Sequence, residues 1–374
     1  MMKRFQKDVI LKDLEKKLVF LVGPRQVGKT WLAKNIALDF KNSLYLNYDK
    51  KSDREIMLLE SWLDNTELLI LDELHKMENW KNYLKGVYDT KPHTMRILVT
   101  GSSRMDIFDQ IGDSLAGRYF KHRLMPLSLS ELTQCHFPAD INKLLTLGGF
   151  PEPYLSDDLI EANRWRLQYI NSLLSTDVFE FDKVQNIKAM RLIFNLLRAR
   201  VGSPVSYQSL AEDVSVSPST VKKYVQILEA LYIIFIVTPY SNNIARSLLK
   251  EPKIYFFDTG LVEGNEGAKL ENLVAISLLK HAYAKTDMFA EEFFLHYLRT
   301  KEGQEVDFAL IYQDKIVQML EVKLSDGTPN PALKYFHEKY HFSAIQLVKN
   351  LRTEHQQKGV QILNAQKYLS ELLI

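Results

Sequence analysis

The stretch from Lys17 to Ile36, KLVFLVGPRQVGKTWLAKNI, constrains the fold more than any other part of the chain. An apolar run leads into the spacing G-x-x-x-x-G-K-T and then into a helix-like segment. Glycines at these positions let a turn fold its backbone N–H groups around phosphate oxygens, while the lysine reaches the terminal phosphates and the hydroxyl can ligate magnesium. Strand, turn and helix in this order are the context that such a phosphate-binding loop, or P-loop, requires.

The P-loop predicts a nucleoside triphosphate as the ligand. The residues expected around its phosphates are Gly23, Pro24, Arg25, Gln26, Val27, Gly28, Lys29 and Thr30. A second apolar run, ELLILDELHK, ends in Asp72 and Glu73. We expect Asp72 to hold Mg²⁺ together with Thr30, and Glu73 to orient or deprotonate the attacking water. An adjacent carboxylate pair is usually a solvated strand end, but the P-loop upstream favours the catalytic interpretation.

Two further candidates follow along the chain. The run MRILVTGSS ends in small polar residues, so Ser102 or Ser103 could sense the γ-phosphate, although Gly-Ser-Ser is also an ordinary loop sequence. Arg118 follows a glycine and is a candidate arginine finger, a residue that stabilises transition-state charge and often comes from a neighbouring subunit. A surface ion pair is an equally weighted interpretation of Arg118, and Arg104 is a weaker candidate.

Five apolar runs alternate with helical segments in this part of the chain: LVFLVG, SLYLNY, ELLILDE, MRILVTG and YFKHRL. This alternation is typical of an α/β fold with a parallel sheet and helices on both faces. Ligands of such sheets lie at the carboxyl ends of the strands, where Lys29, Asp72 and Ser102 fall. Because the stretch LGGFPEPYL is dense in glycine and proline, we place a boundary there. The expected domains are residues 1–150, 151–260 and 261–374.

Composition excludes several classes of protein. A formal net charge of +2 makes any nucleic-acid surface a local patch rather than a property of the whole chain. The single cysteine, Cys135, excludes an internal disulfide and an all-cysteine zinc site, as expected in a reducing compartment. The N-terminus lacks a secretory signal, and the longest apolar run, LYIIFIV, is far shorter than the ~20 residues of a membrane span. We expect a cytoplasmic protein with no membrane partner.

The middle of the chain predicts a winged helix. Three amphipathic segments, NIKAMRLIFNLLRAR, SYQSLAEDV and SPSTVKKYVQILEALYI, precede two β-rich runs, YIIFIVTPY and PKIYFFD. Ser217 is the expected N-cap of the third helix. Nucleic-acid contacts are expected near the start of that helix, from Ser219, Thr220, Lys222 and Lys223. Nine Lys or Arg against five Asp or Glu between Asn186 and Gly260 suit a phosphate-contacting patch, and subunit packing is an equally weighted alternative.

The C-terminal part contains two alternating runs, QEVDFALIY and VQMLEVKL. If they form an antiparallel hairpin, a two-residue loop at 313–314 places Asp307 opposite Leu320 and mixes polar with apolar side chains on both faces. A loop with an odd number of residues places Asp307 opposite Glu321, and Lys323 shares their face. The side-chain pattern therefore favours the odd loop.

Two facing carboxylates repel each other unless a cation lies between them. Asp307 and Glu321 are therefore expected to bind a divalent ion, with Lys323 steadying the attacking hydroxide or the phosphoryl charge. Glu271, in the helical segment KLENLVAISLLKH, is a further candidate ligand. The spacing favours a working or inherited metal site over a plain polar strand face.

Together, these motifs resemble the AAA+-like ATP-binding proteins of bacteria and archaea that carry a C-terminal domain of unknown function. The resemblance spans nearly the whole chain and includes GPRQVGKT, LLILDE, TGSS, SLAGR, LGGFPE, PKIYFFDTGL, ENLV, EVDF and LEVK. It implies an AAA-type ATPase core with ATP and Mg²⁺, a winged-helix segment, and a C-terminal α/β fold similar to the PD-(D/E)xK nucleases. It assigns Lys29, Thr30, Asp72 and Glu73 to the ATPase and Asp307, Glu321 and Lys323 to the nuclease-like site. Val306 stands where the nuclease pattern has proline.

Two functions fit these expectations. The first is an ATP-driven enzyme whose nucleotide state sets the winged helix and the C-terminal site onto nucleic acid, DNA in preference to RNA. The second is a nucleotide-dependent switch that controls assembly or a protein partner, with an inactive nuclease-like domain used for docking. If Arg118 acts in trans, the protein forms a homo-oligomer.

Overall fold

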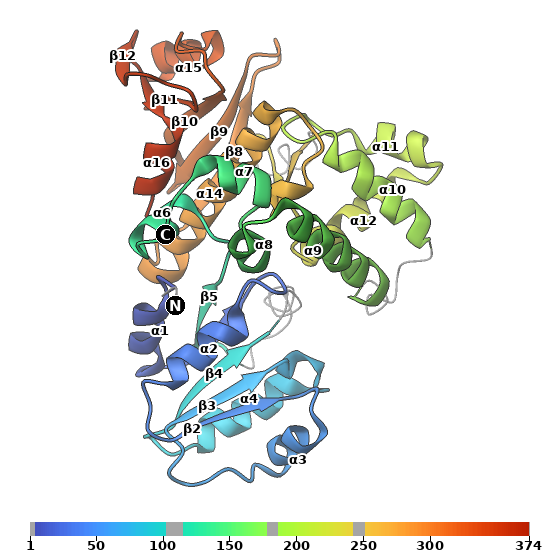
Figure 1. The fold of residues 1–374 in the computed structure, drawn as a ribbon, viewed down its shortest axis with the longest axis vertical. Helices are drawn as coiled ribbons and strands as arrows, with labels where there is room; N and C mark the ends of the chain where they lie inside the picture. The colour runs from blue at the N-terminus through green and yellow to red at the C-terminus, as the bar shows by residue number, and fades with distance from the viewer. Residues whose placement is uncertain (1–3, 102–114, 178–185, 242–250, 374) are drawn as a thin grey trace. The chain divides into compact units, whose positions relative to one another are not determined.

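The structure is a computed structural model that describes residues 4–101, 115–177, 186–241 and 251–373 (Figure 1). The chain divides into two compact units, Met1–Met125 and Pro126–Ile374. The first unit contains the predicted parallel sheet, with strand order β2-β3-β4-β1-β5. Its strands are β1 (Leu18–Val22), β2 (Ser43–Asn47), β3 (Leu68–Asp72), β4 (Arg96–Thr100) and β5 (Tyr119–Arg123). Its helices are α1 (Lys7–Leu14), α2 (Lys29–Ala37), α3 (Lys51–Leu59), η1 (Leu74–Lys76) and α4 (Trp80–Thr90).

Residue alternation along these strands divides the core of the first unit between two faces. On one face, Phe20 of β1 and Leu71 of β3 share a buried cluster with Leu84 and Val87 of α4. Helix α2 packs on β2, β3 and β4 through other residues, with Leu32 fully buried. This sandwich holds the carboxyl ends of β1, β3 and β4 at one edge of the sheet, where the predicted phosphate site lies.

The second unit begins with a helical region. Its helices are α6 (Leu129–Gln134), α7 (Ile141–Leu147), α8 (Pro151–Ser156), α9 (Leu159–Ser172), the π-helical turn η3 (Leu173–Asp177), α10 (Ile187–Arg198), α11 (Tyr207–Val214) and α12 (Pro218–Ala230). An antiparallel pair follows, β6 (Ile234–Val237) with β7 (Lys253–Phe256). As predicted, Ser217 caps α12, because its hydroxyl accepts a hydrogen bond from the Thr220 N–H at 3.1 Å.

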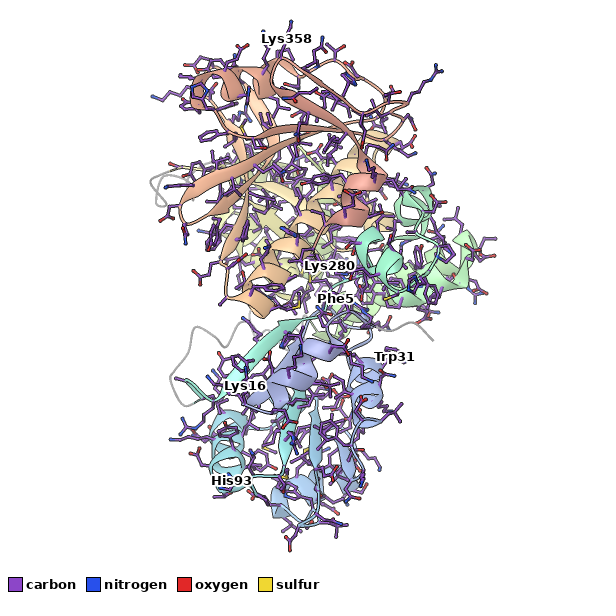
Figure 2. The ribbon with its side chains drawn as sticks, turned by 90° about the vertical axis from the view of Figure 1, so that its left-hand side faces the viewer. Phe5, Lys16, Trp31, His93, Lys280 and Lys358 are labelled. Atoms are coloured by element: carbon purple, nitrogen blue, oxygen red, sulfur yellow. The ribbon has the colours of Figure 1, made fainter. Side chains whose placement is uncertain are left out.

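A six-stranded mixed sheet completes the second unit, in the order β12-β13-β11-β10-β9-β8. Its elements are η5 (Thr259–Leu261), α14 (Glu266–Phe289), β8 (Phe293–Arg299), β9 (Glu305–Tyr312), β10 (Lys315–Lys323), α15 (Pro331–Tyr340), β11 (Ala344–Val348), β12 (His355–Gln357), β13 (Val360–Asn364) and α16 (Ala365–Glu371). The long helix α14 is tied to α6 by a buried ion pair between Lys280, labelled in Figure 2, and Glu131 at 2.5 Å. Arg166 of α9 and Asp258 form another buried pair in this unit.

The β9–β10 hairpin corrects one detail of the sequence prediction. The loop contains two residues, Gln313 and Asp314, both with positive φ, and not an odd number. The register shifts between Ile316 and Gln318, where a bulge brings Phe308 opposite Leu320 as the odd loop was expected to do. The polar and apolar faces therefore separate as predicted, but the bulge is responsible.

Candidate functional site

The P-loop is shaped by glycines that no other residue could replace without strain. Gly23 has φ +141°, and a Cβ atom there would lie 2.2 Å from the carbonyl oxygen of Leu124. Gly28 has φ +101° and immediately precedes α2. The loop is held from outside by Arg4, whose guanidinium donates to the carbonyls of Val27 at 3.1 Å and Met125 at 2.6 Å. The loop backbone is therefore fixed in the open turn that phosphate binding needs.

Three predicted residues meet at this edge of the sheet. The Lys29 ammonium donates to the loop carbonyls of Gly23 and Pro24 at 2.9 and 2.6 Å. The Thr30 hydroxyl donates to Asp72 Oδ2 at 3.1 Å. Helix α2 and strand β3 thus bring together the amine, hydroxyl and carboxylate that the sequence assigns to phosphate and Mg²⁺. This donor set, a hydroxyl and a carboxylate beside a phosphate cradle, fits a magnesium ion.

Glu73 directly follows β3 in the left-handed conformation, at φ 56°. Its side chain is 22% exposed, and Oε2 lies 3.6 Å from both His75 Nε2 and Lys76 Nζ. Burial raises the pKa of Glu73 above its ordinary value, and Lys76 opposes this shift. A carboxylate of increased basicity beside Asp72 suits proton transfer from water.

Sequence reasoning missed two hydroxyl groups that donate hydrogen bonds to the Asp72 carboxylate. The Tyr45 phenol donates to Asp72 Oδ2 at 2.5 Å, and the Thr100 hydroxyl donates to Oδ1. Burial and the bond to Asp72 raise the pKa of Tyr45 to about 12, so the phenol remains a donor. The alternation of SLYLN is a signal that Tyr45 and Asn47 share a strand face, but only the β2–β3 register brings that face to Asp72.

The structure places Arg118 away from the P-loop of its own chain. Arg118 precedes β5, whose first residue pairs with Leu18, the first residue of β1. It therefore lies at the amino edge of the sheet, about 16 Å of strand from the phosphate loop. Its guanidinium binds the Asp89 carboxylate at 2.9 and 3.1 Å. An arginine finger at this position could serve only another subunit. Ser102, Ser103 and Arg104 lie outside the described residues.

The second candidate site joins β9, β10 and α14. The Val322 N–H donates to Asp307 Oδ2 at 3.0 Å, and the Asp307 N–H donates to Glu321 Oε2 at 3.4 Å. Glu321 Oε1 accepts from Lys323 at 2.8 Å and from the Asn330 amide at 2.7 Å. The three predicted residues Asp307, Glu321 and Lys323 therefore lie in one hydrogen-bonded cluster.

A lysine that sequence reasoning missed also lies in this cluster. Lys253 of β7 is 1% exposed, and its ammonium lies 2.8 Å from Glu305, 3.3 Å from Asp307 and 3.4 Å from Glu271. The signal was a charged residue in the apolar run PKIYFF, because a buried lysine needs paired carboxylates. Glu271 is further fixed by the Tyr255 hydroxyl at 2.7 Å.

The charged groups of this cluster shift one another's pKa values. Burial, reinforced by the neighbouring Asp307, raises the pKa of Glu271 to about 8 and that of Glu321 to about 7. Burial lowers the pKa of Lys253, but the surrounding carboxylates outweigh it and raise the pKa overall, so the ammonium stays charged. Among the described residues, no group of three or more His, Cys, Asp or Glu is arranged to hold a metal ion.

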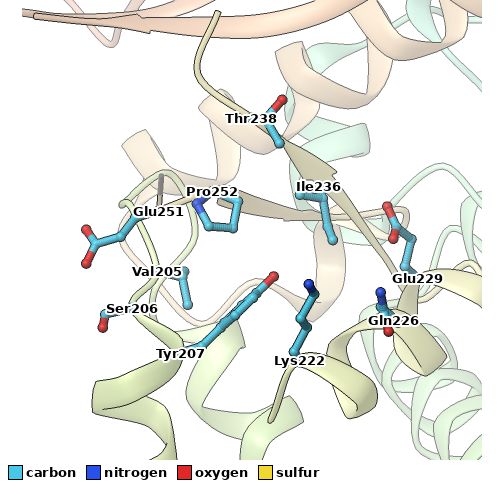
Figure 3. A pocket seen from close by; sticks show the side chains of 10 residues that line it. All are labelled: Val205, Ser206, Tyr207, Lys222, Gln226, Glu229, Ile236, Thr238, Glu251 and Pro252. Carbon is cyan, nitrogen blue, oxygen red and sulfur yellow. The ribbon is translucent and has the colours of Figure 1, made fainter. Parts of the chain in front are cut away.

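The predicted nucleic-acid residues lie at the start of α12. Ser219 and Thr220 hydroxyls each lie 2.8 Å from Ser217 Oγ, so they belong to the helix cap. Lys222 lines a pocket of about 660 Å³ between α11, α12 and the β6–β7 pair (Figure 3). Figure 3 shows Tyr207 and Lys222 reaching toward the same space, with Glu229 farther along α12.

No helix within the described ranges is long and apolar enough to cross a membrane.

Comparison with known proteins agrees with the geometry of the first unit. Residues 15–133 match the family model described as an AAA domain. The first unit thus carries a P-loop domain of AAA type. Residues 138–269 and 266–368 match two models that are each described as a domain of unknown function, DUF8612 and DUF4143.

Relatives extend over most of the chain. The uncharacterized protein MJ1544 of Methanocaldococcus jannaschii is 24% identical over 372 residues, which cover 90% of this chain and 81% of the relative. The uncharacterized protein Rv2008c of Mycobacterium tuberculosis is 25% identical over 304 residues, which cover 78% of this chain and 66% of the relative. Among solved structures, the Walker-type ATPase paby2304 of Pyrococcus abyssi aligns with 70% of this chain and 95% of its own, at 15% identity and a TM-score of 0.46.

Proposed function

We propose that the protein binds and hydrolyses ATP at the edge of the first sheet. The observation that carries this proposal is the convergence of Lys29, Thr30 and Asp72 around one glycine-shaped loop, with Glu73 beside them. The AAA domain match over residues 15–133 supports it. The test compares the binding of a fluorescent ATP analogue to wild type and to Gly23→Ala. The added methyl group should abolish binding, because it would clash with the Leu124 carbonyl. Equal binding by both proteins would count against this site.

Each residue has a separate task in the proposed reaction. The loop backbone and Lys29 hold the phosphates, and Lys29 exchanges its carbonyl contacts for phosphate oxygens. Thr30 and Asp72 would hold Mg²⁺, which neutralises phosphate charge when bound. Glu73 accepts a proton from the attacking water or orients it. Tyr45 and Thr100 fix the orientation of the Asp72 carboxylate.

For the second unit we propose nucleic-acid binding through α10–α12 and the β6–β7 pair, used as a winged helix, with DNA preferred over RNA. Support comes from the order of three helices and a strand pair, and from Lys222 and Lys223 in the first turns of α12. The nuclease-like site is tested by incubating linear, circular and single-stranded DNA and RNA with Mg²⁺ or Mn²⁺, with and without ATP. Cutting that Asp307→Ala abolishes would establish a nuclease, whereas absence of cutting with ATP hydrolysis intact would reject one.

A second candidate function is favoured by Lys253. Its ammonium lies among the carboxylates that would bind a metal in a nuclease. This arrangement suits a nucleotide-dependent switch whose C-terminal domain has a docking role and does not cut. Unchanged hydrogen exchange in the second unit between nucleotide-free and ATP-bound protein would argue against the switch.

A further inference from the structure

We infer that the ammonium group of Lys253 is the resident cation of the carboxylate cluster and that it excludes divalent ions from the site. The inference rests on the second candidate function, since it gives the physical reason why a nuclease-like site would not cut. Facing carboxylates such as Asp307 and Glu321 repel each other unless a cation lies near them. The chain supplies this cation from β7, which is distant from them in sequence.

The Lys253 side chain is built into the site. A lysine ammonium has three N–H donors, and three carboxylates lie within 3.4 Å of Nζ: those of Glu305, Asp307 and Glu271. The same ammonium lies 5.5 Å from the centre of the Tyr297 ring. Each donor thus has an acceptor, and the side chain is closed off from solvent.

The carboxylate oxygens are occupied as well. Asp307 uses Oδ1 for Lys253 and Oδ2 for the Val322 N–H. Glu321 uses Oε1 for Lys323 and Asn330, and Oε2 for the Asp307 N–H. A divalent ion needs several of these oxygens at roughly 2.0 to 2.6 Å, so it would compete with these protein donors for both carboxylates.

Lys253 cannot easily withdraw to admit an ion. Its strand pairs with β6, where Lys253 lies opposite Val237. Farther along the strand, the Asn272 side chain of α14 bonds both the N–H and the carbonyl of Phe256 at 2.7 and 2.9 Å. An ion and the ammonium would also repel each other within the same group of carboxylates. Occupancy by Lys253 and by a divalent ion is therefore mutually exclusive.

The test is Mn²⁺ binding to the nucleotide-free full-length protein, measured from the electron paramagnetic resonance signal of free Mn²⁺. Four proteins are compared: wild type, Asp307→Asn, Lys253→Met and the double variant Lys253→Met with Asp307→Asn. Methionine keeps most of the side-chain length and removes the charge. Any ion at Thr30 and Asp72 adds the same background to all four proteins. We expect wild type and Asp307→Asn to bind alike, and Lys253→Met to bind one additional Mn²⁺ that the double variant loses.

An Mn²⁺ ion that binds wild type and is lost in Asp307→Asn would overturn the inference. A folded Lys253→Met protein with no additional ion would also overturn it. Melting curves of Lys253→Met should show a lowered Tm, and Mn²⁺ should raise this Tm by more than it raises that of wild type, whose increase reports only the background ion at Thr30 and Asp72. If Lys253→Met does not fold, the comparison of wild type with Asp307→Asn decides alone. ATP hydrolysis is measured separately, so failure of the ATPase proposal leaves these outcomes unchanged.

Discussion

Arg166 Nε lies 2.7 Å from Asp258 Oδ2 in the interior of the second unit, and two glycines make room for this ion pair. A Cβ at Gly148 would lie 1.8 Å from Asp258 Oδ1, and one at Gly260 would lie 2.0 Å from Arg166 Cζ. The sequence motifs LGGFPE and YFFDTGL therefore meet each other in space. Packing around this ion pair explains why Gly148, Asp258 and Gly260 occur in these motifs.

Gly148→Ala should destabilise the second unit by about 3 kcal/mol or more, because it forces apart a buried ion pair and strains a residue at φ +73°. The matched control is Gly327→Ala, whose Cβ would make only ordinary contacts, the nearest at 3.6 Å. Urea unfolding of both variants provides the measurement. Equal stability of the two variants would show that the ion pair tolerates the added methyl group.

Replacing Lys222 and Lys223 together with alanine should weaken DNA binding. Each lysine that neutralises a phosphate contributes about −0.9 to the slope of log K against log salt concentration. The slope of the double variant should therefore be less steep by about 2. Fluorescence anisotropy over a range of salt concentrations measures it. The control is Lys334→Ala on α15, where the lysine lies 3.5 Å from Glu338. An unchanged slope would remove α12 from the proposed interface.

Glu229 should make stability depend on pH. Burial of its carboxyl group raises the pKa of Glu229 from 4.5 to about 7, although the residue as a whole is exposed. Between pH 4.5 and 7 the folded state keeps a proton on Glu229 that the unfolded state has lost. The free energy of unfolding should therefore fall as pH rises from about 4.5 to 7, and it should stay at the lower value above pH 7. Glu229→Gln should remove this loss and gain about 1 kcal/mol or less at pH 8, since the pocket is open to solvent.

Thermal melts of Glu229→Gln and wild type at pH 5 and pH 8 test this expectation. The matched control is Glu212→Gln on α11, whose carboxylate accepts a hydrogen bond from Gln208 at the surface. A stability difference that is the same at both pH values would contradict the assignment to ionisation of Glu229.

Local pattern predicted much of the first unit. Neighbours in sequence determine the strand, turn and helix around Gly23 and Gly28, and also the strand that ends at Asp72. The sequence therefore predicted at which edge of the sheet the phosphate site lies. The contacts of Tyr45 and Arg4 could not, because they depend on strand register and on a segment distant in sequence. The direction of β5 shows why Arg118 lies far from the loop, which spacing alone does not reveal.

In the second unit, side-chain alternation predicted that Asp307 and Glu321 face each other. It did not reveal the bulge that produces this register, because a two-residue turn with a bulge and an odd loop give the same pairing at Phe308. Lys253 was missed for a different reason. It is 54 residues from Asp307 in sequence, and only tertiary packing of β7 against β9 and α14 brings its charge into the cluster.

Steady-state ATP turnover of Glu73→Gln tests whether the protein hydrolyses ATP with Glu73 as the water-activating carboxylate. We predict that turnover falls by about 10²-fold or more while ATP binding stays close to that of wild type. Glu78→Gln, a nearby exposed carboxylate, is the matched control and should turn over ATP normally. A Glu73→Gln protein that hydrolyses ATP at the wild-type rate would contradict this role of Glu73. A wild-type protein that does not hydrolyse ATP would contradict the ATPase function itself.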